Sequence, residues 1–498
     1  MAGLASSIPL DENNMDSVTF KAPDYQLDGS FTSSEYTFEG DESSGWIISR
    51  NGNRVLGLGA GYVLVKTLHC GVCSTDLARR FLPYPLPQVI GHEVVGTWNG
   101  KTVVSEINAS HLARNLEADM CAPCSSGMES HCPERITLGI DRLPGGFSPY
   151  FLAPVNGLKE IPATLPSETA AIVEPLAAAL QAVHRTPPRE GDKVAVIGPR
   201  RLGALIIASL AGYRKKQNTV FSISALVRHH KLKDLCSNLG ADDVVIVDSQ
   251  NLGSLSRQFD VVYDTTGTTE GFMMALELAK RVVHLKSTNG QSVAGLDYLT
   301  EMVVDEIGLL PYSSGNLLFS WLNKVQSGEV RNIFVSSDLS DEMADEIAML
   351  RPEATITRCS VFDDREALLE AVTGHHQEGF TRFDVAVVAG LQEVNAVIRP
   401  IPEYGISLVR PRGNVLLGAD ATASGNRLFD ALTKRQLEIH TSRCGSFPAA
   451  LQLLKDNSSL LTVLRKDFIT HRFSLDQIDQ AFEIASDSSQ SIKVVVSI

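Results

Sequence analysis

The spacing of hydrophobic positions along the chain changes near residue 167. Before it, short apolar runs such as "YVLVKTLHCGVC" (62–73) and "VIGHEVVGTW" (89–98) are rich in β-branched residues and broken by glycine. Such runs predict the strands of a small, strongly twisted barrel domain. From Ser167, a candidate N-cap, the apolar positions follow a helical period in "SETAAIVEPLAAALQAVHRT".

After residue 190, continuous apolar strands alternate with helical segments. Strands are expected at 193–198, 220–227, 242–247 and 259–267, and helices at 200–213 and 229–240. Strands without polar alternation that are joined by helices predict a parallel sheet covered on both faces. We therefore expect an α/β, doubly wound Rossmann domain in this part of the chain.

The later part of the chain partly repeats this pattern. "FDVVYDTTG" at 259 is echoed by "FDVAVVAG" at 383, and the stretch 305–328 is echoed by 437–459. Between the copies another β-α-β-α-β pattern is expected, without a glycine-rich loop. Only short stretches match, so internal duplication and coincidence stay open as equal alternatives. We assign 311–436 to an extra, degenerate Rossmann-like α/β module.

Composition narrows the class of protein. The 498 residues are 44% hydrophobic, which is enough for two or three domains. A net charge of −14 argues against nucleic acid or an anionic membrane surface as a partner. No apolar run is long enough to span a bilayer and the first residues do not resemble a secretion signal, so we expect a cytoplasmic protein. Residues 1–58 form an acidic N-terminal extension, either a flexible arm or a layer of strands over the next domain.

Cysteine usage points to metal binding. Five of the eight cysteines lie between residues 70 and 132, which is unlike a disulfide scaffold. Cys73, His92 and Glu174 offer a thiolate, an imidazole and a carboxylate, the three ligands that a catalytic zinc with an open fourth position requires. Glu93, beside His92, is an occasional ligand or a supporting group. Thr75 would hold a hydroxyl near the open position to move a proton.

Asp76 is expected to orient a ligand by accepting its remaining N–H.

The motifs "CGVCSTDL", "GHEVVG" and "VEPLAAAL", in this order and before a Rossmann unit, resemble the zinc-dependent medium-chain dehydrogenases, such as alcohol, sorbitol, glucose and threonine dehydrogenases. The resemblance covers about 60–310 and a piece near 437–498. It implies a GroES-like twisted β-barrel catalytic domain over 59–180 plus 437–498, and a Rossmann cofactor domain over 181–310.

A second cysteine group lies in "CAPCSSGMESHC". Cys121, Cys124 and Cys132 match the last three ligands of the structural zinc lobe in the family that the chain resembles. The position of the first ligand is Ala118 here, so we expect a neighbour, Asp119, to complete an atypical zinc site. Glu117, His111 and His131 are the other candidates, and an empty lobe with reduced cysteines is the alternative.

The stretch "VIGPRRLG" (196–203) resembles an altered dinucleotide loop. Gly198 and Gly203 keep the tight turn and the close helix packing, but Arg200 stands where a middle glycine lets the backbone approach the pyrophosphate. Its guanidinium and that of Arg201 would bring positive charge to a phosphate site at a helix N-terminus. The remaining predicted cofactor-binding residues are Leu202, Arg228, His229, Thr266, Gly267, Lys286 and Ser287.

Arg228 and His229 occupy the end of the second strand, where an acidic residue would bind the ribose of NAD. We therefore favour NADP over NAD. The leading hypothesis is a zinc-dependent oxidoreductase that transfers hydride between NADP and an alcohol, aldehyde or ketone. The alternative is a non-catalytic descendant that keeps zinc for stability and acts as a binding or scaffold protein. A homodimer is one option, because the family that the chain resembles often pairs Rossmann edge strands.

Overall fold

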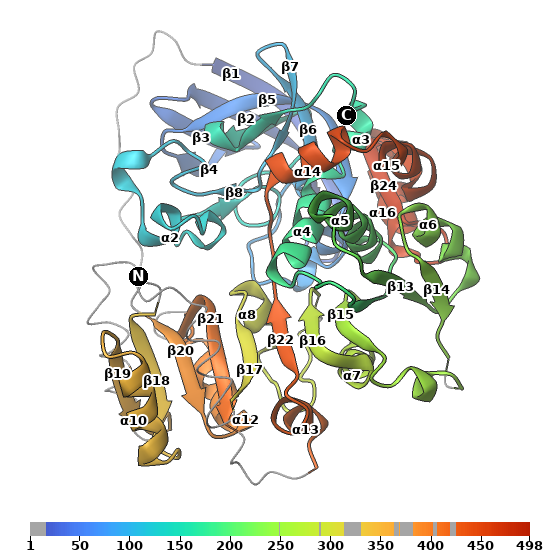
Figure 1. Cartoon of the computed structure of the whole chain (residues 1–498). Helices are drawn as coiled ribbons and strands as arrows, with labels where there is room; N and C mark the ends of the chain where they lie inside the picture. Colours follow the sequence, from blue (N-terminus) through green and yellow to red (C-terminus); the bar gives the residue numbers. More distant parts are fainter. Residues whose placement is uncertain are drawn as a thin grey trace. The chain divides into compact units, whose positions relative to one another are not determined.

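The computed structural model describes residues 16–248, 250–287, 290–312, 330–362, 368, 382–401, 406–418 and 425–498. The chain divides into two compact units (Figure 1). Unit 1 comprises Met1–Pro175 and Phe447–Ile498, and unit 2 comprises Leu176–Ser446. Each unit is built on its own β-sheet core.

Unit 1 contains the barrel that the β-branched runs predicted. Its 7-stranded sheet has the order β11-β7-β6-β5-β24-β23, with β10 paired to β5. The strands are β5 (Tyr62–Val72), β6 (Glu93–Trp98), β7 (Lys101–Ser105), β10 (Tyr150–Pro154), β11 (Leu158–Glu160), β23 (Ile469–Ser474) and β24 (Lys493–Ser497). The last strand of the chain thus pairs with the strand that leads into Cys73.

The N-terminal extension is a layer of strands over the described residues 16–58. β1 (Asp16–Tyr25), β2 (Phe31–Asp41), β3 (Gly45–Arg50) and β4 (Asn53–Leu58) form an antiparallel sheet. Phe20 packs edge-on against Phe38 with ring centroids 5.0 Å apart, and Trp46 donates a hydrogen bond to the carbonyl of Tyr62 at the start of β5. Of the two alternatives for this segment, the structure has the strand layer.

Unit 2 holds the predicted Rossmann domain. Six parallel strands lie in the order β14-β13-β12-β15-β16-β22. They are β12 (Lys193–Ile197), β13 (Ser222–Val227), β14 (Asp243–Ile246), β15 (Phe259–Asp264), β16 (Ala279–Leu285) and β22 (Glu438–Thr441). The connecting helices include α5 (Leu202–Gln217), α6 (Lys233–Asn238) and α7 (Thr269–Leu278). This is the doubly wound strand order.

The extra module extends the same sheet. Five more strands follow β22 in the order β17-β21-β20-β18-β19, giving 11 strands among the described residues. They are β17 (Gly308–Tyr312), β18 (Asn332–Ser336), β19 (Thr355–Cys359), β20 (Phe383–Val388) and β21 (Val409–Gly418). The helices nearby are α8 (Leu299–Val304), α10 (Asp341–Leu350), α12 (Leu391–Ile398) and α13 (Arg427–Thr433). One buried core includes side chains from both sets of strands, so the module and the Rossmann strands form one body.

The expected boundary at residue 437 differs from the structure. Residues 437–446, which we placed with the barrel, belong to unit 2, because β22 supplies the strand beside β16. Part of the extra module assigned to 311–436, including 313–329 and 369–381, lies outside the described residues.

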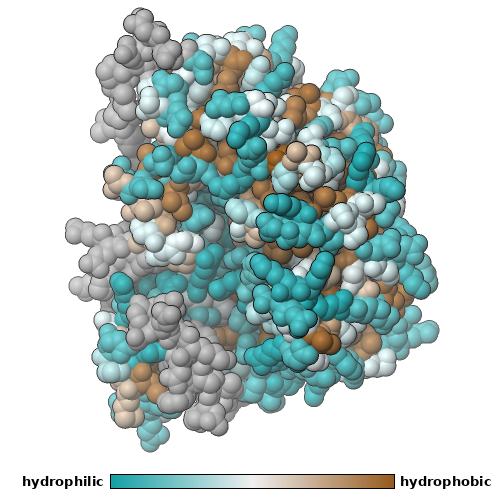
Figure 2. Space-filling model, turned by 45° about the horizontal axis from the view of Figure 1, so that its top comes forward, coloured by the Kyte–Doolittle hydropathy of each residue, from teal (hydrophilic) through white to brown (hydrophobic). Residues whose placement is uncertain are grey.

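Short helices complete the description of unit 1. They are α1 (Ser74–Leu77), α2 (Ala122–Ser125), α3 (Ser167–Ala170), α14 (Phe447–Lys455), α15 (Ser458–Val463) and α16 (Ile478–Ser486), while α4 (Val173–Arg185) begins in unit 1 and ends in unit 2. In the part of the chain that is described, no helix combines the length and apolar character needed to cross a bilayer. Hydrophilic residues predominate on the face shown in Figure 2, with apolar residues in small separate groups.

Candidate active site and metal centre

Cys73 and His92 come together at the end of two paired barrel strands. Cys73 follows β5 and occupies the N-cap position of α1, and His92 immediately precedes β6. His92 is 3% exposed, and its side chain contacts both the thiol of Cys73 and the carboxylate of Asp76. Its Nδ1 lies 3.3 Å from Asp76 Oδ1. Sequence reasoning placed all three residues in one site, and the structure brings them together.

The carboxylate of Asp76 contacts both Cys73 and His92. Its Oδ2 accepts a hydrogen bond from the backbone N–H of Cys73 at 2.8 Å, while Oδ1 faces the His92 ring. Burial alone would lower the pKa of His92, but the neighbouring Asp76 and Cys73 raise it, and the result is well above its usual range. A carboxylate that orients a ligating imidazole is the common supporting arrangement in metal sites.

Glu93 forms an ion pair with a lysine of strand β24. Its carboxylate is 1% exposed and forms an ion pair with Lys493 of β24, whose Nζ also donates to the carbonyl of Val72 at 3.0 Å. The neighbouring strand carries Gly71, where an added Cβ would lie 2.0 Å from Glu93 Oε2. Of the two roles expected for Glu93, this geometry favours the supporting one, because a buried carboxylate neutralised by a lysine binds the strands β5, β6 and β24 together.

Glu174 lies in the first turn of α4 and is half-buried. Among the described residues, its carboxylate does not lie within 4.8 Å of the ligand atoms of both Cys73 and His92. Thr75, in α1 between Cys73 and Asp76, is also half-buried. The structure thus assembles two of the three predicted zinc ligands, with the third in the same unit but farther away.

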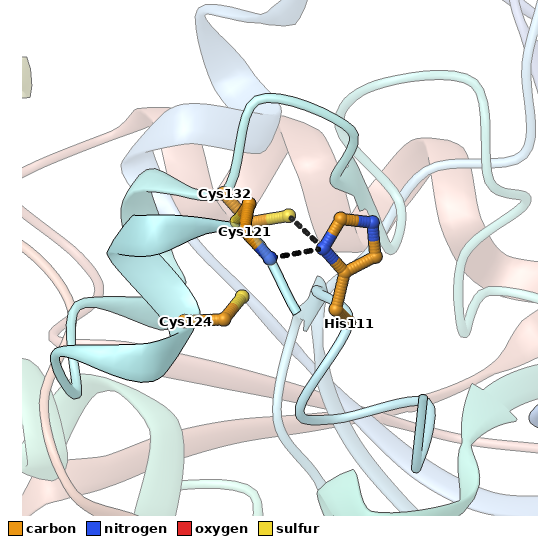
Figure 3. A group of neighbouring side chains, drawn as sticks. All are labelled: His111, Cys121, Cys124 and Cys132. Carbon is orange, nitrogen blue, oxygen red and sulfur yellow. Dashed lines mark hydrogen bonds between the residues drawn. The ribbon is translucent and has the colours of Figure 1, made fainter. Parts of the chain in front are cut away.

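The second cysteine group is fully assembled (Figure 3). His111, Cys121, Cys124 and Cys132 have ligand atoms that all lie within 4.8 Å of one another, and no other such group occurs among the described residues. The short strands β8 (Asn108–Ala109) and β9 (Ile136–Thr137) pair antiparallel, which brings His111 back to the cysteines.

Both ring nitrogens of His111 have polar neighbours. Its Nδ1 accepts the backbone N–H of Cys121 at 3.2 Å and lies 3.8 Å from Cys132 Sγ. Its Nε2 lies 3.0 Å from Glu134 Oε2, so a carboxylate again fixes the ring. Burial raises the pKa of the Cys121 thiol to about 12 and also raises that of Cys132.

Asp119, the expected fourth ligand, is not part of this group. It lies exposed in the 3₁₀ turn Glu117–Asp119, together with the alternative Glu117. His111, another of the alternatives, is 4% exposed and takes the fourth position. The reason is that a turn residue two positions before Cys121 points to solvent, whereas the β8–β9 pairing carries His111 inward.

The altered glycine loop sits at the carboxyl end of β12. Gly198 has a φ of +73°, and the backbone N–H of Arg200 donates to its carbonyl at 2.7 Å. At Gly203, an added Cβ would lie 2.6 Å from Thr265 Oγ1, so only glycine fits where α5 meets β15. Arg201 is the N-cap of α5 and provides no side-chain cap, while Leu202 begins the helix. Arg200 and Arg201 are half-buried.

Other predicted cofactor residues lie at the same edge of the sheet. Arg228 and His229 are exposed directly after β13, and Thr266 and Gly267 follow β15. The strands β13, β12 and β15 are neighbours, so these residues share the carboxyl edge where open α/β sheets bind ligands. Ser287, two residues after β16, is half-buried at this edge.

Asp264, at the end of β15, organises the turn at Thr266. Its Oδ1 accepts the N–H and the hydroxyl of Thr266 at 2.9 and 2.7 Å, while its Oδ2 accepts no hydrogen bond from the described residues. Burial raises the pKa of Asp264 to about 6. Sequence reasoning missed this residue, although a carboxylate that closes the apolar run "VVYD" was a usable signal.

The ammonium group of Lys286 is engaged within the chain. Its Nζ is buried and donates to the carbonyl and hydroxyl of Ser442 and to the carbonyl of Arg443. Next to it, His284 bridges Thr186 Oγ1 and Ser442 Oγ at 2.7 and 2.9 Å. These contacts engage the ammonium group in joining the ends of β16 and β22, and the expected place of Lys286 beside the cofactor stays a prediction.

Comparisons with known proteins agree with this architecture. Residues 59–163 match the alcohol dehydrogenase GroES-like domain. L-threonine 3-dehydrogenase of Sinorhizobium fredii is 28% identical over 260 residues, covering 48% of this chain and 69% of that protein.

Two solved structures share the fold. A short chain alcohol dehydrogenase (rspB) of Escherichia coli CFT073, complexed with NADH, aligns over 96% of this chain and 99% of its own at 16% identity and a TM-score of 0.54. A protein described as a zinc-binding dehydrogenase of Sinorhizobium meliloti, bound to NADP, covers 96% and 100% of the two chains at 17% identity and a TM-score of 0.51. With its GroES-like domain, its Rossmann strands and the ordered ligand motifs, the chain is similar to zinc-type alcohol and threonine dehydrogenases.

Proposed function

We propose that this protein is a zinc-dependent oxidoreductase that transfers hydride between a nicotinamide cofactor and an alcohol, aldehyde or ketone. The observation that carries the proposal is the contact of one buried imidazole, His92, with both the Cys73 thiol and the Asp76 carboxylate. The dehydrogenase activity named for the relatives supports the reaction class.

The donor set fits a catalytic zinc site. A thiolate and a neutral imidazole are preferred zinc ligands, and Glu174, at the start of α4, would complete a set of three. Zinc held there would supply Lewis acidity to a substrate oxygen. Glu93 would take no part as a ligand, since Lys493 neutralises it.

The chain's own side chains have separate tasks in this proposal. Asp76 holds the His92 ring and the backbone of Cys73, so it positions both ligands. Thr75, one residue before Asp76 in α1, would receive and pass on the substrate's proton at Oγ1.

The carboxyl edge of β12, β13 and β15 fits a dinucleotide. The left-handed turn at Gly198 and the N-terminus of α5, which has no side-chain cap, form the phosphate end of such a site. Arg200 and Arg201 add charge there, and the exposed Arg228 and His229 favour the additional phosphate of NADP. The nicotinamide ring would supply or accept the hydride.

A fluorescence titration with NADPH and NADH tests the proposal. We expect saturable binding of both, tighter for NADPH, and an Arg228→Ala variant that loses most of this preference. Arg399→Ala, which removes an exposed arginine after α12, is the matched control and should keep it. If neither nucleotide binds, the scaffold alternative takes the place of the enzyme hypothesis.

A second zinc ion is proposed in the lobe formed by His111, Cys121, Cys124 and Cys132 (Figure 3). Three thiolates and one imidazole form a closed ligand set, the kind that serves structure rather than catalysis. Elemental analysis should find two zinc ions per chain, and Glu174→Gln should lower the content toward one without affecting the lobe.

A further inference from the structure

The 11-stranded sheet of unit 2 consists of two similar halves. We call β14, β13, β12, β15, β16 and β22 the first half, and β17, β21, β20, β18 and β19 the second half. In the first half, Asp260 Oδ2 accepts the N–H of Lys193, the first residue of β12, at 2.8 Å. In the second half, Asp384 Oδ2 accepts the N–H of Asn332, the first residue of β18, also at 2.8 Å. The same side chain thus joins equivalent strands in both halves.

The segments that lead into β17 and β22 match as well. Glu306 has a φ of +54° and Gln436 a φ of +56°, and each lies two residues before its strand. Positive φ is uncommon for residues other than glycine, so its recurrence at equivalent positions is specific. A short helix, α8 or α13, precedes each of these turns. This resemblance is independent of the short sequence matches, and it favours duplication over coincidence.

The two halves exchange one strand. β17 follows β16 in the sequence but pairs in parallel with β21 of the second half. β22 follows β21 in the sequence but pairs in parallel with β16 of the first half. At the junction of the halves β17 and β22 run antiparallel, with Leu309 opposite Ile439, and both side chains are fully buried (Figure 1).

The parallel strands of the second half also end at a common carboxyl edge. The side chain of Glu393 occupies this edge. Glu393 of α12 is 4% exposed and accepts hydrogen bonds from the Ser336 hydroxyl at the end of β18 and from the N–H of Ala389 after β20. In the first half the corresponding ends of β12 and β15 carry the Gly198 turn and Thr265. A buried carboxylate in place of that turn would repel the phosphates of a nucleotide.

We propose that the second half is a built-in partner that replaces a second copy of this chain. An open edge strand invites pairing with another chain. In a symmetric dimer, a shared sheet would place the same strand of both copies antiparallel about the two-fold axis. β17 and β22, the equivalent strands of two similar halves, make this contact within one chain. The protein is therefore a monomer with reciprocally exchanged strands and one nucleotide site.

Engineered cysteines test the strand exchange directly. In a Leu309→Cys, Ile439→Cys double variant, the two Cα atoms face each other across the antiparallel pair, within the range that a disulfide bridges. After mild oxidation we expect a bond within one chain, seen as a monomer on a non-reducing gel and as a 309–439 cross-linked peptide. The single variants are the controls for the native cysteines. A covalent dimer, or a folded protein without the bond, would overturn the arrangement.

Two measurements on the unmodified protein complete the test. Sedimentation velocity should give one species near 53.9 kDa from about 1 to 100 µM, and a persistent dimer would contradict the built-in partner. Calorimetric titration with NADPH should give one site per chain, and two sites would contradict the filled second edge. The absence of binding would refute the proposed function alone, because the cross-link tests the strands separately.

Discussion

The two candidate metal centres of unit 1 differ in how much of each is assembled. In the lobe, all four ligands lie within 4.8 Å of one another. At the candidate active site, His92 meets Cys73 and Asp76, while Glu174 stays outside such a group. The lobe ligands come from the single stretch 111–132, whereas the predicted active-site ligands lie just after β5, just before β6 and in α4. Local chain geometry closes the first centre, and the second depends on tertiary packing.

This difference favours a structural role for the lobe and a catalytic role for the Cys73 centre. A closed set of ligands with no open position stabilises a fold, and an incompletely enclosed one leaves room for a substrate. Both imidazoles are backed by a carboxylate, Asp76 for His92 and Glu134 for His111. Asp76 is 1% exposed and the side chain of Glu134 is 69% exposed, so only the first support is shielded from water.

The largest expected effect is on turnover. Cys73→Ser should reduce the turnover number by about 1,000-fold or more, since it removes a ligand of the group that stabilises charge on the substrate oxygen. Zinc content should fall from two to one per chain, and the unfolding temperature should change little. Steady-state kinetics on a panel of alcohols, with elemental analysis, provides the readout. Unchanged activity in this variant would remove the catalytic role from the Cys73 centre.

The matching change in the lobe should act on stability. His111→Ala removes a ligand, which costs at least the 10–100-fold in zinc affinity typical of outer supporting residues, or about 1.4–2.8 kcal/mol. For a unit of this size we expect a decrease of about 3–10 °C in Tm, measured by calorimetry. Turnover per folded molecule should be nearly unchanged. A normal Tm together with lost activity would reverse the roles of the two centres.

The contrast between the centres also shows what the sequence could predict. The barrel runs and the Rossmann strands follow from local spacing, the grouping of the lobe cysteines follows from the resemblance, and the structure contains all of them. His111 could not be singled out, because its position depends on the pairing of β8 with β9, two residues each. Nor could the short strand "EIHT" reveal that it pairs with β16, since a four-residue strand does not encode its neighbour.

The side-chain partners of Lys286 could not be predicted for a related reason. The resemblance predicts that the backbone at Lys286 passes the nicotinamide, but the acceptors of its side chain come from Ser442 and Arg443, more than 150 residues later. The ion pair between Glu93 and Lys493 likewise joins residues 400 positions apart. A charged residue next to the apolar run "VVVS" of β24 was the only local signal for it.

An intermediate decrease in turnover number is expected when the carboxylate beside His92 is replaced. Asp76→Asn keeps the shape of the side chain but removes its charge, and loss of a supporting carboxylate typically costs 10–100-fold in metal affinity or activity. We expect a decrease in turnover number of that size, with partial recovery at high zinc concentration. The corresponding Glu134→Gln variant should change neither activity nor zinc content measurably, because its side chain is largely exposed. Equal effects of the two variants would contradict the distinction between shielded and solvated support.

The smallest expected effect concerns the fourth ligand of the lobe. Asp119→Asn should leave zinc content, Tm and turnover unchanged, because Asp119 is exposed and His111 takes the place beside the cysteines. A single variant cannot separate these residues if either can bind zinc, so His111→Ala and the Asp119→Asn, His111→Ala double variant should be compared by competition with a chromogenic chelator. Equal zinc affinities of these two proteins mean that Asp119 gives no help even when His111 is absent. A weaker double variant would mean that the turn can move its carboxylate to the metal, and the lobe would then be as adaptable as the active site.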